Sequence, residues 1–350
     1  MHMEAQINYE FHSEFNDHYT TPTKHIVRML SENSRVSISE IAERMALSRR
    51  TIKERLTKTE KALDLRYTIE FNEDTLGLAM PHAIVVELEK KPDLGYVQTL
   101  LLKSHIPQLA FTIKGKNRML IYAIGTTPKE YAYWDNAMTV LLSEYGINWH
   151  SSEVMHKQLG FVPLRSELID KLHVEDKYKP MLKILNENSR ASFRYIATKL
   201  GMHFNTVVYN FNKLLKRGYI KRFTLTMTPQ PNMYTMAFWA KYAPKKDLEK
   251  STAKLRRAFM SDDKYSITSR YSICAPLIGS YDHFGIGVFD NYGSAYEHLV
   301  QYHKQSLGRH MSKILYGEVD RILIGRLPMR SIDTKTDYSV INWTADIGDL

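Results

Sequence analysis

Two helical segments place cationic and short polar side chains where they could contact a polyanion. The first spans about residues 49–63 and turns Ile52, Leu56 and Leu63 to one side, so the remaining side chains face outward. The second spans about residues 204–216 and shows the same spacing. A helix fits the major groove of duplex DNA, where cations neutralise phosphates and polar groups reach base edges. The spacing therefore predicts recognition of double-stranded DNA.

The outward side chains divide into two predicted roles. Candidate base readers lie at the helix starts, and they are Arg49, Arg50, Lys53, Asn205, Thr206, Tyr209 and Asn210. Candidate phosphate contacts follow them, and they are Lys58, Lys61, Arg66, Lys213, Lys216, Lys221 and Arg222. Ser48 is the predicted N-cap of the first helix, and Thr51 and Thr57 complete its polar surface.

The net charge of +10 is concentrated in two stretches of the chain. Residues 1–165 hold 20 basic and 20 acidic side chains, whereas residues 166–350 hold 28 and 18. Residues 177–222 carry 11 basic residues and one acid, and residues 24–66 carry 11 basic and six acidic residues. Such clusters favour nucleic acid as the partner, with an anionic membrane surface as the second interpretation. A well-solvated surface explains the charge alone equally well.

The rest of the composition argues against several other classes of protein. Cys274 is the single cysteine, so neither an internal disulfide nor a CxxC metal site can form. The apolar runs are far shorter than the roughly 18 residues that a membrane span needs, and no apolar signal core opens the chain. No catalytic spacing emerges from the histidines or from Cys274. We therefore expect a cytoplasmic protein that is not an enzyme and that uses no metal, no cofactor and no membrane.

The sequence predicts an internal duplication. The stretch SENSR at 31–35 recurs as NENSR at 186–190, an offset of 155 residues. The apolar positions on both sides of this stretch recur with it. Later landmarks such as Gly115 and Gly279 follow at an offset of 164 to 165, which indicates a loop insertion.

Each copy opens with a pattern of three short helices. In the first copy, the first predicted helix starts at Thr21-Pro22, and the second and third span 39–45 and 49–63. In the second copy, the three predicted helices span 181–185, 193–200 and 204–216. Gly218 occupies the position of a C-cap glycine, and a basic, strand-like run follows at 223–227. Three helices followed by a basic β-wing are the layout of a winged helix-turn-helix.

Each copy then continues with an alternation of strands and helices. The predicted strands of the first copy are 83–89, 108–113, 119–125 and 149–156, with helices at 94–103 and 128–145. Those of the second copy are 236–242, 266–272, 283–289 and 314–324, with helices at 248–259 and 294–308. The predicted fold class is therefore α+β, in two repeats of a winged helix-turn-helix and a ferredoxin-like βαββαβ domain.

Several short motifs carry a resemblance to a known family. In the first copy these are Ile38-x-x-Ile41-Ala42, Leu47-Ser48-x-x-Thr51 and Leu76-Gly77-Leu78. In the second they are Asn188-x-Arg190, Gly218-x-Ile220 and Ile278-Gly279-x-x-Asp282. On these motifs the chain resembles the leucine-responsive and asparagine regulator (Lrp/AsnC) family over about residues 21–328, as a tandem fusion of two modules. The family joins a winged helix-turn-helix to a RAM-like βαββαβ effector domain.

The resemblance implies a transcriptional regulator whose two effector domains pair through their sheets. Here they would pair within one chain as a pseudo-dimer, and pairing of two chains stays open. Some relatives bind small amino acids near that interface, but the sequence gives no sign of such an effector. The copies also depart from the family pattern, since the first has Leu63-Asp64-Leu65 at the wing and the second has His203 at the cap position.

A second family shares this architecture. The siroheme decarboxylases resemble the same regulators and hold a tetrapyrrole with histidine and basic residues of the βαββαβ domains. The candidates in this chain are His283, Arg270 and Lys241. The first copy has Met119 where the second has His283, and a retired DNA-binding unit would not be expected to keep its charge. This enzyme is therefore the alternative to a DNA-binding regulator.

The predicted boundaries follow from these patterns. They give an N-terminal arm at 1–20, a winged helix-turn-helix at 21–75, a ferredoxin-like domain at 76–163, a linker and second winged helix-turn-helix at 164–230, a second ferredoxin-like domain at 231–328 and a C-terminal tail at 329–350.

Overall fold

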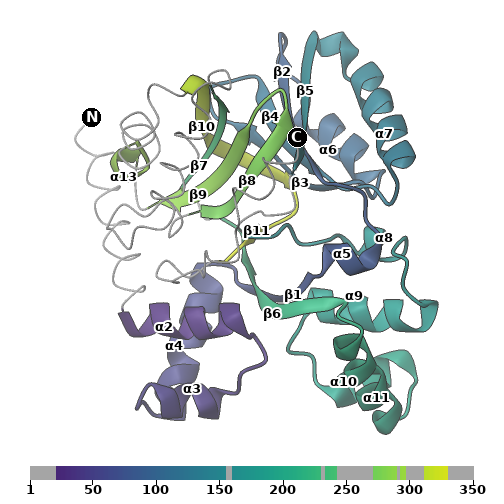
Figure 1. Cartoon of the computed structure of the whole chain (residues 1–350). Helices are drawn as coiled ribbons and strands as arrows, with labels where there is room; N and C mark the ends of the chain where they lie inside the picture. The colour runs from purple at the N-terminus through teal and green to yellow at the C-terminus, as the bar shows by residue number, and fades with distance from the viewer. Residues whose placement is uncertain are drawn as a thin grey trace, which may run out of the picture.

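The computed structural model describes residues 21–154, 160–229, 233–242, 271–289, 292–296 and 311–329. Two three-helix units lie side by side at one end, a small sheet runs between them, and a large antiparallel barrel lies beyond that sheet (Figure 1). The predicted α+β class with winged helix-turn-helix units and ferredoxin-like domains is confirmed. The predicted N-terminal arm and nearly all of the C-terminal tail lie outside the described residues.

The helices of both units lie where the sequence places them. The first unit consists of α2 (Thr21–Glu32), α3 (Ile38–Arg44) and α4 (Arg49–Ala62), and the second of α9 (Lys179–Glu187), α10 (Phe193–Leu200) and α11 (Phe204–Lys216). Ser37, Ser48 and Ser192 cap α3, α4 and α10 with their hydroxyl groups, as expected of such residues at helix starts. Within the described part of the chain, every helix is too short or too polar to cross a membrane.

The turn between the second and third helix differs chemically between the units. Gly201 makes it in the second unit with a φ of 63°, whereas Ala46 makes it in the first with a φ of 52°. A left-handed backbone is unstrained only for glycine, so the first unit holds this turn against a conformational cost. Gly218 also has a positive φ of 69°, directly after the C-cap of α11, as the sequence predicts.

The strand that follows each unit does not form a wing of its own. β1 (Arg66–Phe71) and β6 (Ile220–Met227) pair with each other in antiparallel register, Ile69 opposite Phe223, and β11 (Leu327–Pro328) adds to β6. The predicted strand at 223–227 is part of β6, and the sequence did not show that it pairs with β1. The two strands are used to join the two helical units, because each supplies the hydrogen-bonding edge that the other lacks.

The barrel closes through strands of both copies. Its order is β10-β3-β4-β2-β5-β8-β9-β7, and its strands are β2 (His82–Leu88), β3 (Pro107–Ile113), β4 (Arg118–Ala123), β5 (Ile147–Val154), β7 (Tyr234–Tyr242), β8 (Tyr271–Gly279), β9 (His283–Phe289) and β10 (Met311–Ile324). Pairs β5–β8 and β3–β10 join the copies. The remaining described helices are α5 (Glu73–Leu76), α6 (Leu94–Leu102), α7 (Pro128–Leu141), α8 (Ser166–Ile169) and α13 (Tyr292–Tyr296), with short 3-10 helices η1 (Ser143–Tyr145) and η2 (Asp176–Tyr178).

The strand predictions were accurate for the first copy and partly wrong for the second. The predicted strand 266–272 ends too early, since β8 (Tyr271–Gly279) continues to Gly279, and residues 266–270 of the predicted strand lie outside the described residues. Pro276 interrupts the apolar pattern of this strand, and proline normally argues against an interior strand. Predicted helix 248–259 and most of 294–308 lie outside the described residues.

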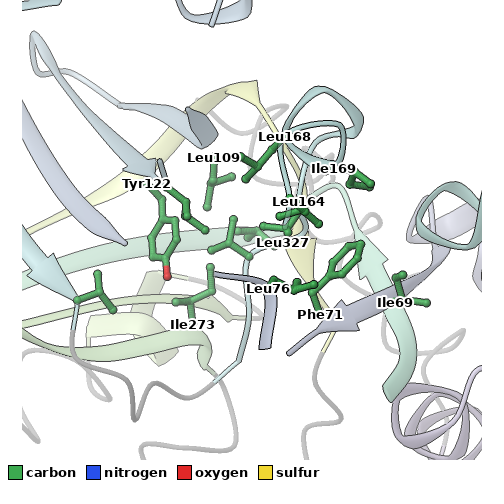
Figure 2. Close-up of a cluster of buried hydrophobic side chains, with 14 of the residues drawn as sticks. Ile69, Phe71, Leu76, Leu109, Tyr122, Leu164, Leu168, Ile169, Ile273 and Leu327 are labelled. Atoms are coloured by element: carbon green, nitrogen blue, oxygen red, sulfur yellow. The ribbon is translucent and has the colours of Figure 1, made fainter. Parts of the chain in front are cut away.

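One buried cluster connects the barrel to the small sheet. Figure 2 shows side chains of this cluster. Tyr122 and Ile273 come from the barrel, and Phe71 and Leu327 come from the small sheet. The cluster also continues into the second helical unit, whereas the first unit has its own core around Leu30. The second unit and the barrel therefore share a hydrophobic core, which stabilises their relative placement.

The repeated Asn-Ser-Arg stretch lies where the two helical units meet. Ser34 and Ser189 are fully buried, and their hydroxyl oxygens are 2.5 Å apart. Arg35 donates to the carbonyl of Ser189 at 2.5 Å, and Arg190 donates to the carbonyl of Ser34 at 3.0 Å. Thus equivalent residues of the two units exchange equivalent hydrogen bonds.

The next strand repeats this exchange. The hydroxyl of Thr68 donates to the carbonyl of Asn186 at 2.7 Å, and that of Thr224 donates to the carbonyl of Ser31 at 2.8 Å. Ser31 and Asn186 are equivalent at the offset of 155 residues, and Thr68 and Thr224 lie opposite each other in the pairing of β1 with β6. The units are consequently held in one fixed relation by a set of buried polar contacts, which are costly to break without replacement.

Arg35 should be a main contributor to this junction. Its guanidinium lies 5.1 to 5.6 Å from the ring centroids of Phe193, Phe211 and Phe223, and burial together with Arg190 lowers its pKa. Replacing Arg35 with alanine should lower the free energy of unfolding by about 2–4 kcal/mol, because it removes its bonds to the carbonyls of Ser189 and Ala191 and the stacking. Urea unfolding would measure this. Arg28→Ala, which breaks an exposed ion pair with Glu32, should change it by at most about 0.5 kcal/mol. Equal effects of the two changes would refute this assignment.

Candidate nucleic-acid interface

The N-terminal half of α4 presents the predicted polar surface to solvent. Arg49, Arg50 and Lys53 are exposed, and Arg50 forms an ion pair with Glu54 at 2.9 Å. Ser48 accepts a hydrogen bond from the backbone N–H of Thr51 at 3.0 Å, and their hydroxyl groups are 2.8 Å apart. These two hydroxyl groups are therefore engaged in capping the helix.

The phosphate candidates of α4 lie along the same exposed side. Thr57, Lys58 and Lys61 are all exposed. Because Arg50, Thr57 and Lys61 are spaced by seven and four residues, they lie above one another on one helical face. The face therefore carries cations in its first and last turns, with Glu54 between them.

The second helix, α11, exposes a different set of groups. Asn205, Thr206 and Tyr209 are exposed, with 59% of Tyr209 accessible to solvent. Lys213 is half-buried with its ammonium 5.3 Å from the ring centroid of Tyr209, and Lys216 is exposed. This surface carries more aromatic and amide character than that of α4.

Asn210 does not belong to this surface. It is buried with 7% exposure, on the side of α11 that also buries Val207, Phe211 and Leu214. The prediction that Asn210 reads a base is corrected. The sequence pattern failed here because asparagine is usually a surface residue, and the packing of the second unit turned this position inward.

The cations of the small sheet are held by nearby acids. Lys221 lies 2.8 Å from Glu70, Arg222 forms a further ion pair with the same carboxylate, and Arg66 lies 3.4 Å from Asp64. Only 4% of the Glu70 side chain is exposed. The charges of Lys221 and Arg222 are consequently offset by a buried carboxylate. The sequence analysis, which predicted both as phosphate contacts, did not show this ion pairing.

The tetrapyrrole candidates are not brought together as one open site. His283 is 3% exposed, and its Nε2 lies 3.2 Å from the thiol of Cys274. Strand alternation places it on the face opposite Phe284, which belongs to the interior cluster. Lys241 forms an ion pair with Asp282 at 3.2 Å, and Arg270 lies outside the described residues.

A second polar cluster lies where the two copies join in the barrel, and the sequence analysis did not identify it. Tyr281 is 3% exposed, and its backbone N–H donates to the hydroxyl of Ser152 at 3.2 Å. The ring of His150 lies 6.0 Å from that of Tyr281 in an edge arrangement, and the ammonium of Lys313 lies 5.9 Å from its centroid. No sequence signal could have shown this, because the residues come from different copies.

An ion pair borders this cluster. Arg118 pairs with Glu87, and the Nε of Arg118 is buried with no hydrogen-bond acceptor among the described residues. The pKa of Tyr281 is raised, because burial and the charge of Glu87 outweigh the opposite effect of Arg118. The cluster thus contains acidic, basic and phenolic groups together. Among the described residues, no group of three His, Cys, Asp or Glu side chains is arranged to hold a metal ion.

Comparison with known sequences identifies the first helical unit. Residues 22–62 match the family model of winged helix-turn-helix DNA-binding domains. This match ends at the last residue of α4, so it covers the three helices of the first unit. A search of curated proteins gives no match. The chain therefore carries a winged helix-turn-helix DNA-binding domain in its N-terminal part.

Comparison with solved structures extends the likeness to nearly the whole chain. A crystal structure of the siroheme decarboxylase NirDL covers 94% of this chain and 99% of that chain, with 11% identity and a TM-score of 0.50. A transcriptional regulator of Neisseria meningitidis in complex with L-Met covers 43% and 98%, with 24% identity and a TM-score of 0.34. The leucine response regulatory protein of Mycobacterium tuberculosis covers 39% and 93%, with 15% identity and a TM-score of 0.33. At 11% identity, the likeness to the decarboxylase establishes the duplicated fold.

The prediction that this protein is not an enzyme is contradicted by that comparison. The solved structure that matches over 94% of the chain is that of a decarboxylase, so the two-copy architecture is one that an enzyme uses. The prediction rested on the lack of a catalytic spacing along the sequence. Spacing along one chain segment cannot show a cluster that two distant copies assemble, as around Tyr281.

The carboxyl group of Glu73, which lies near Glu70 of the small sheet, should make the stability of the fold depend on pH. Burial, with Glu70 nearby, raises the pKa of Glu73 from 4.5 to about 7. The folded chain therefore binds this proton more tightly than the unfolded chain. The resulting stabilisation is complete below pH 4.5 and is lost as the pH rises through 7, on the order of 2 kcal/mol.

Glu73→Gln should consequently gain stability relative to the wild type between pH 5 and pH 8, by that amount. Urea unfolding at pH 5, 6, 7 and 8 would measure the difference, with the exposed Glu43→Gln as the matched control. A difference between Glu73→Gln and wild type that stays constant over this range would refute the assignment.

Proposed function

We propose that this protein is a transcriptional regulator that reads duplex DNA through two non-identical recognition helices, α4 and α11. The observation that carries the proposal is the match of residues 22–62 to winged helix-turn-helix DNA-binding domains, combined with the exposed cationic face of α4. The proposal extends the same role to α11, which projects from an equivalent three-helix unit. The cation-rich surface would supply the affinity for phosphates.

The proposed roles follow from position and exposure. Base readers are Arg49, Arg50 and Lys53 on α4 with Asn205, Thr206 and Tyr209 on α11, and phosphate contacts are Lys58, Lys61, Lys213 and Lys216 with Arg66. Lys221 and Arg222 have a smaller part, since Glu70 offsets their charges. Because the two helices differ, one chain would prefer a non-palindromic site.

The buried junction at Ser34 and Ser189 bears on the geometry of that site. It fixes the two helical units relative to each other, so binding requires no reorganisation of one unit against the other. Two helices held in a fixed relation would read half-sites about one helical turn, roughly 10 base pairs, apart. The ferredoxin-like domains would then serve as the platform that pairs the copies, within the domain boundaries given above.

Variants of α4 should separate the two roles. After selection of an operator from random duplexes, Arg49→Ala with Arg50→Ala should weaken operator binding by about 1–3 kcal/mol for each lost base contact and should leave random duplex nearly unaffected. Lys58→Gln with Lys61→Gln should weaken both equally and reduce the salt slope by roughly 2. Fluorescence anisotropy across a salt series measures both quantities.

The matched control for this experiment is Lys103→Gln, an exposed lysine at the end of α6 in the barrel domain. It should bind both duplexes as the wild type does. If the wild type binds no duplex at low salt, the proposed function is wrong. If both pairs of α4 changes affect operator and random duplex alike, the division of roles is wrong.

A tetrapyrrole enzyme is the second candidate, and two observations favour it. One is the likeness to siroheme decarboxylase over 94% of the chain. The other is the cluster around Tyr281, in which His150 could transfer a proton while Arg118 and Lys313 pair with acidic substituents of a substrate. Such a substrate would lie where the two copies join rather than at His283.

This candidate has a spectroscopic test that does not depend on DNA. If it is correct, titration of siroheme into the full chain should shift the absorption spectrum of the tetrapyrrole, and His150→Ala should weaken that binding at least tenfold. His25→Ala, on the exposed side of α2, is the control and should bind as the wild type does. An unchanged siroheme spectrum would exclude this candidate.

A further inference from the structure

A cavity of about 380 Å³ opens beside the recognition helix of the second unit. It is lined by Lys177, Tyr178, Tyr209, Lys213, Lys216 and Arg217. The residues come from two places, because η2 supplies one wall just before α9, and α11 with its C-cap supplies the other. Four of the six lining residues are therefore cations.

Aromatic rings hold these cations in place. Tyr178 is 2% exposed, and the ammonium of Lys177 and the guanidinium of Arg217 lie 4.9 and 5.5 Å from its ring centroid. Lys213 lies 5.3 Å from the ring of Tyr209 on the opposite wall. Cation–π contacts restrict long side chains that would otherwise move freely in solvent. The cations are thus preorganised around one concave space.

The charge in this space is only partly compensated. Glu175 lies 2.7 Å from Lys177 and also pairs with Arg217. The hydrogen bond with Glu175 raises the pKa of Lys177, and a hydrogen bond with the Tyr219 hydroxyl, together with Glu175, raises that of Arg217. This carboxylate pairs with two of the four lining cations, and the lining itself contains no acid. Cations gathered in a concave site create a field that favours an anionic ligand, and arginine and lysine together suit phosphate.

The first unit lacks the same arrangement. At the offset of 155 residues, the positions of Lys177, Tyr178, Tyr209 and Arg217 hold Pro22, Thr23, Glu54 and Ala62. Only the two lysines of α11 have counterparts, at Lys58 and Lys61. The cavity is therefore a property of the second copy and not of the fold that both copies share.

We propose that this cavity binds a nucleotide-like phosphate ester. The phosphate would lie between Lys177, Lys213 and Arg217, and the attached ring would stack on the exposed face of Tyr209. The volume supports more than a single phosphate group, since small-molecule sites begin near about 300 Å³. A nucleotide of the DNA backbone and a free nucleotide share this chemistry. The backbone source rests on the proposed function, whereas the free nucleotide does not.

The test uses the full chain with substitutions in each wall. Lys177→Gln with Arg217→Gln alters one wall, and Lys213→Gln with Lys216→Gln alters the other, so the test does not depend on the folding of a single variant. Lys171→Gln with Lys199→Gln is the matched control, because both lysines are exposed and outside the cavity. Thermal unfolding of each variant confirms that it is folded.

Two probes distinguish the sources. Adenosine monophosphate is titrated by calorimetry, with inorganic phosphate as the ringless comparison, and a random 20-base-pair duplex is titrated across a salt series. Both wall variants should weaken at least one of the two nucleotide probes tenfold or more, and the control should not. Loss of duplex affinity with a salt slope reduced by roughly 2, and no binding of the mononucleotide, would identify a backbone nucleotide.

Binding of adenosine monophosphate by the wild type that both wall variants lose would identify a free phosphate ester, and Tyr209→Leu should then bring its affinity down to that of inorganic phosphate. If the wild type binds duplex and neither wall variant weakens either probe, the cavity proposal is overturned while the proposed function stands. If the wild type binds the mononucleotide but no duplex, the proposed function fails and the cavity proposal stands. If it binds neither probe, both are overturned.

Discussion

The exchange between Ser34 and Arg35 of one helical unit and Ser189 and Arg190 of the other is the contact on which the remaining geometry depends. Two fully buried hydroxyl groups and two guanidinium groups meet there, and each guanidinium is satisfied by a carbonyl of the opposite unit. Burial of like charges is unfavourable, as the lowered pKa of Arg35 shows, and the carbonyls and aromatic rings offset it. Because a displaced unit would leave these groups unsatisfied, α4 and α11 have one relative position.

The cations of this chain fall into two groups. Some pair with a buried carboxylate and stabilise the fold, and others are open to a ligand. On the small sheet, Lys221 and Arg222 share the buried carboxylate of Glu70, so their charge stabilises the junction. Along α4 and beside α11, cations such as Lys58, Lys61 and Lys213 face solvent or line a cavity without an acid in its lining. A count of basic residues cannot make this distinction, because it depends on which carboxylates the fold brings near them.

Closure of the barrel joins the two copies into one continuous sheet. Each copy alone would leave two sheet edges unpaired, and the pairs β5–β8 and β3–β10 remove those edges. Closure also assembles side chains of both copies around Tyr281, where a buried Arg118 Nε has no acceptor among the described residues. The likeness to a decarboxylase over 94% of the chain shows the duplicated fold, and function depends on the residues that occupy the joint.

The sequence by itself determined the local elements and the class of the fold. Apolar spacing and caps such as Ser48 predicted the six helices of the two units and the strands of the first copy, because both depend on contacts only a few residues apart. The tertiary structure determined how those elements pair and pack. It paired β1 with β6 instead of forming wings, buried Asn210, brought Lys177 and Arg217 to the cavity beside α11, and placed His283 against Cys274. These outcomes depend on which separate elements meet in the folded chain or on which helix face is packed, and no local pattern contains that information.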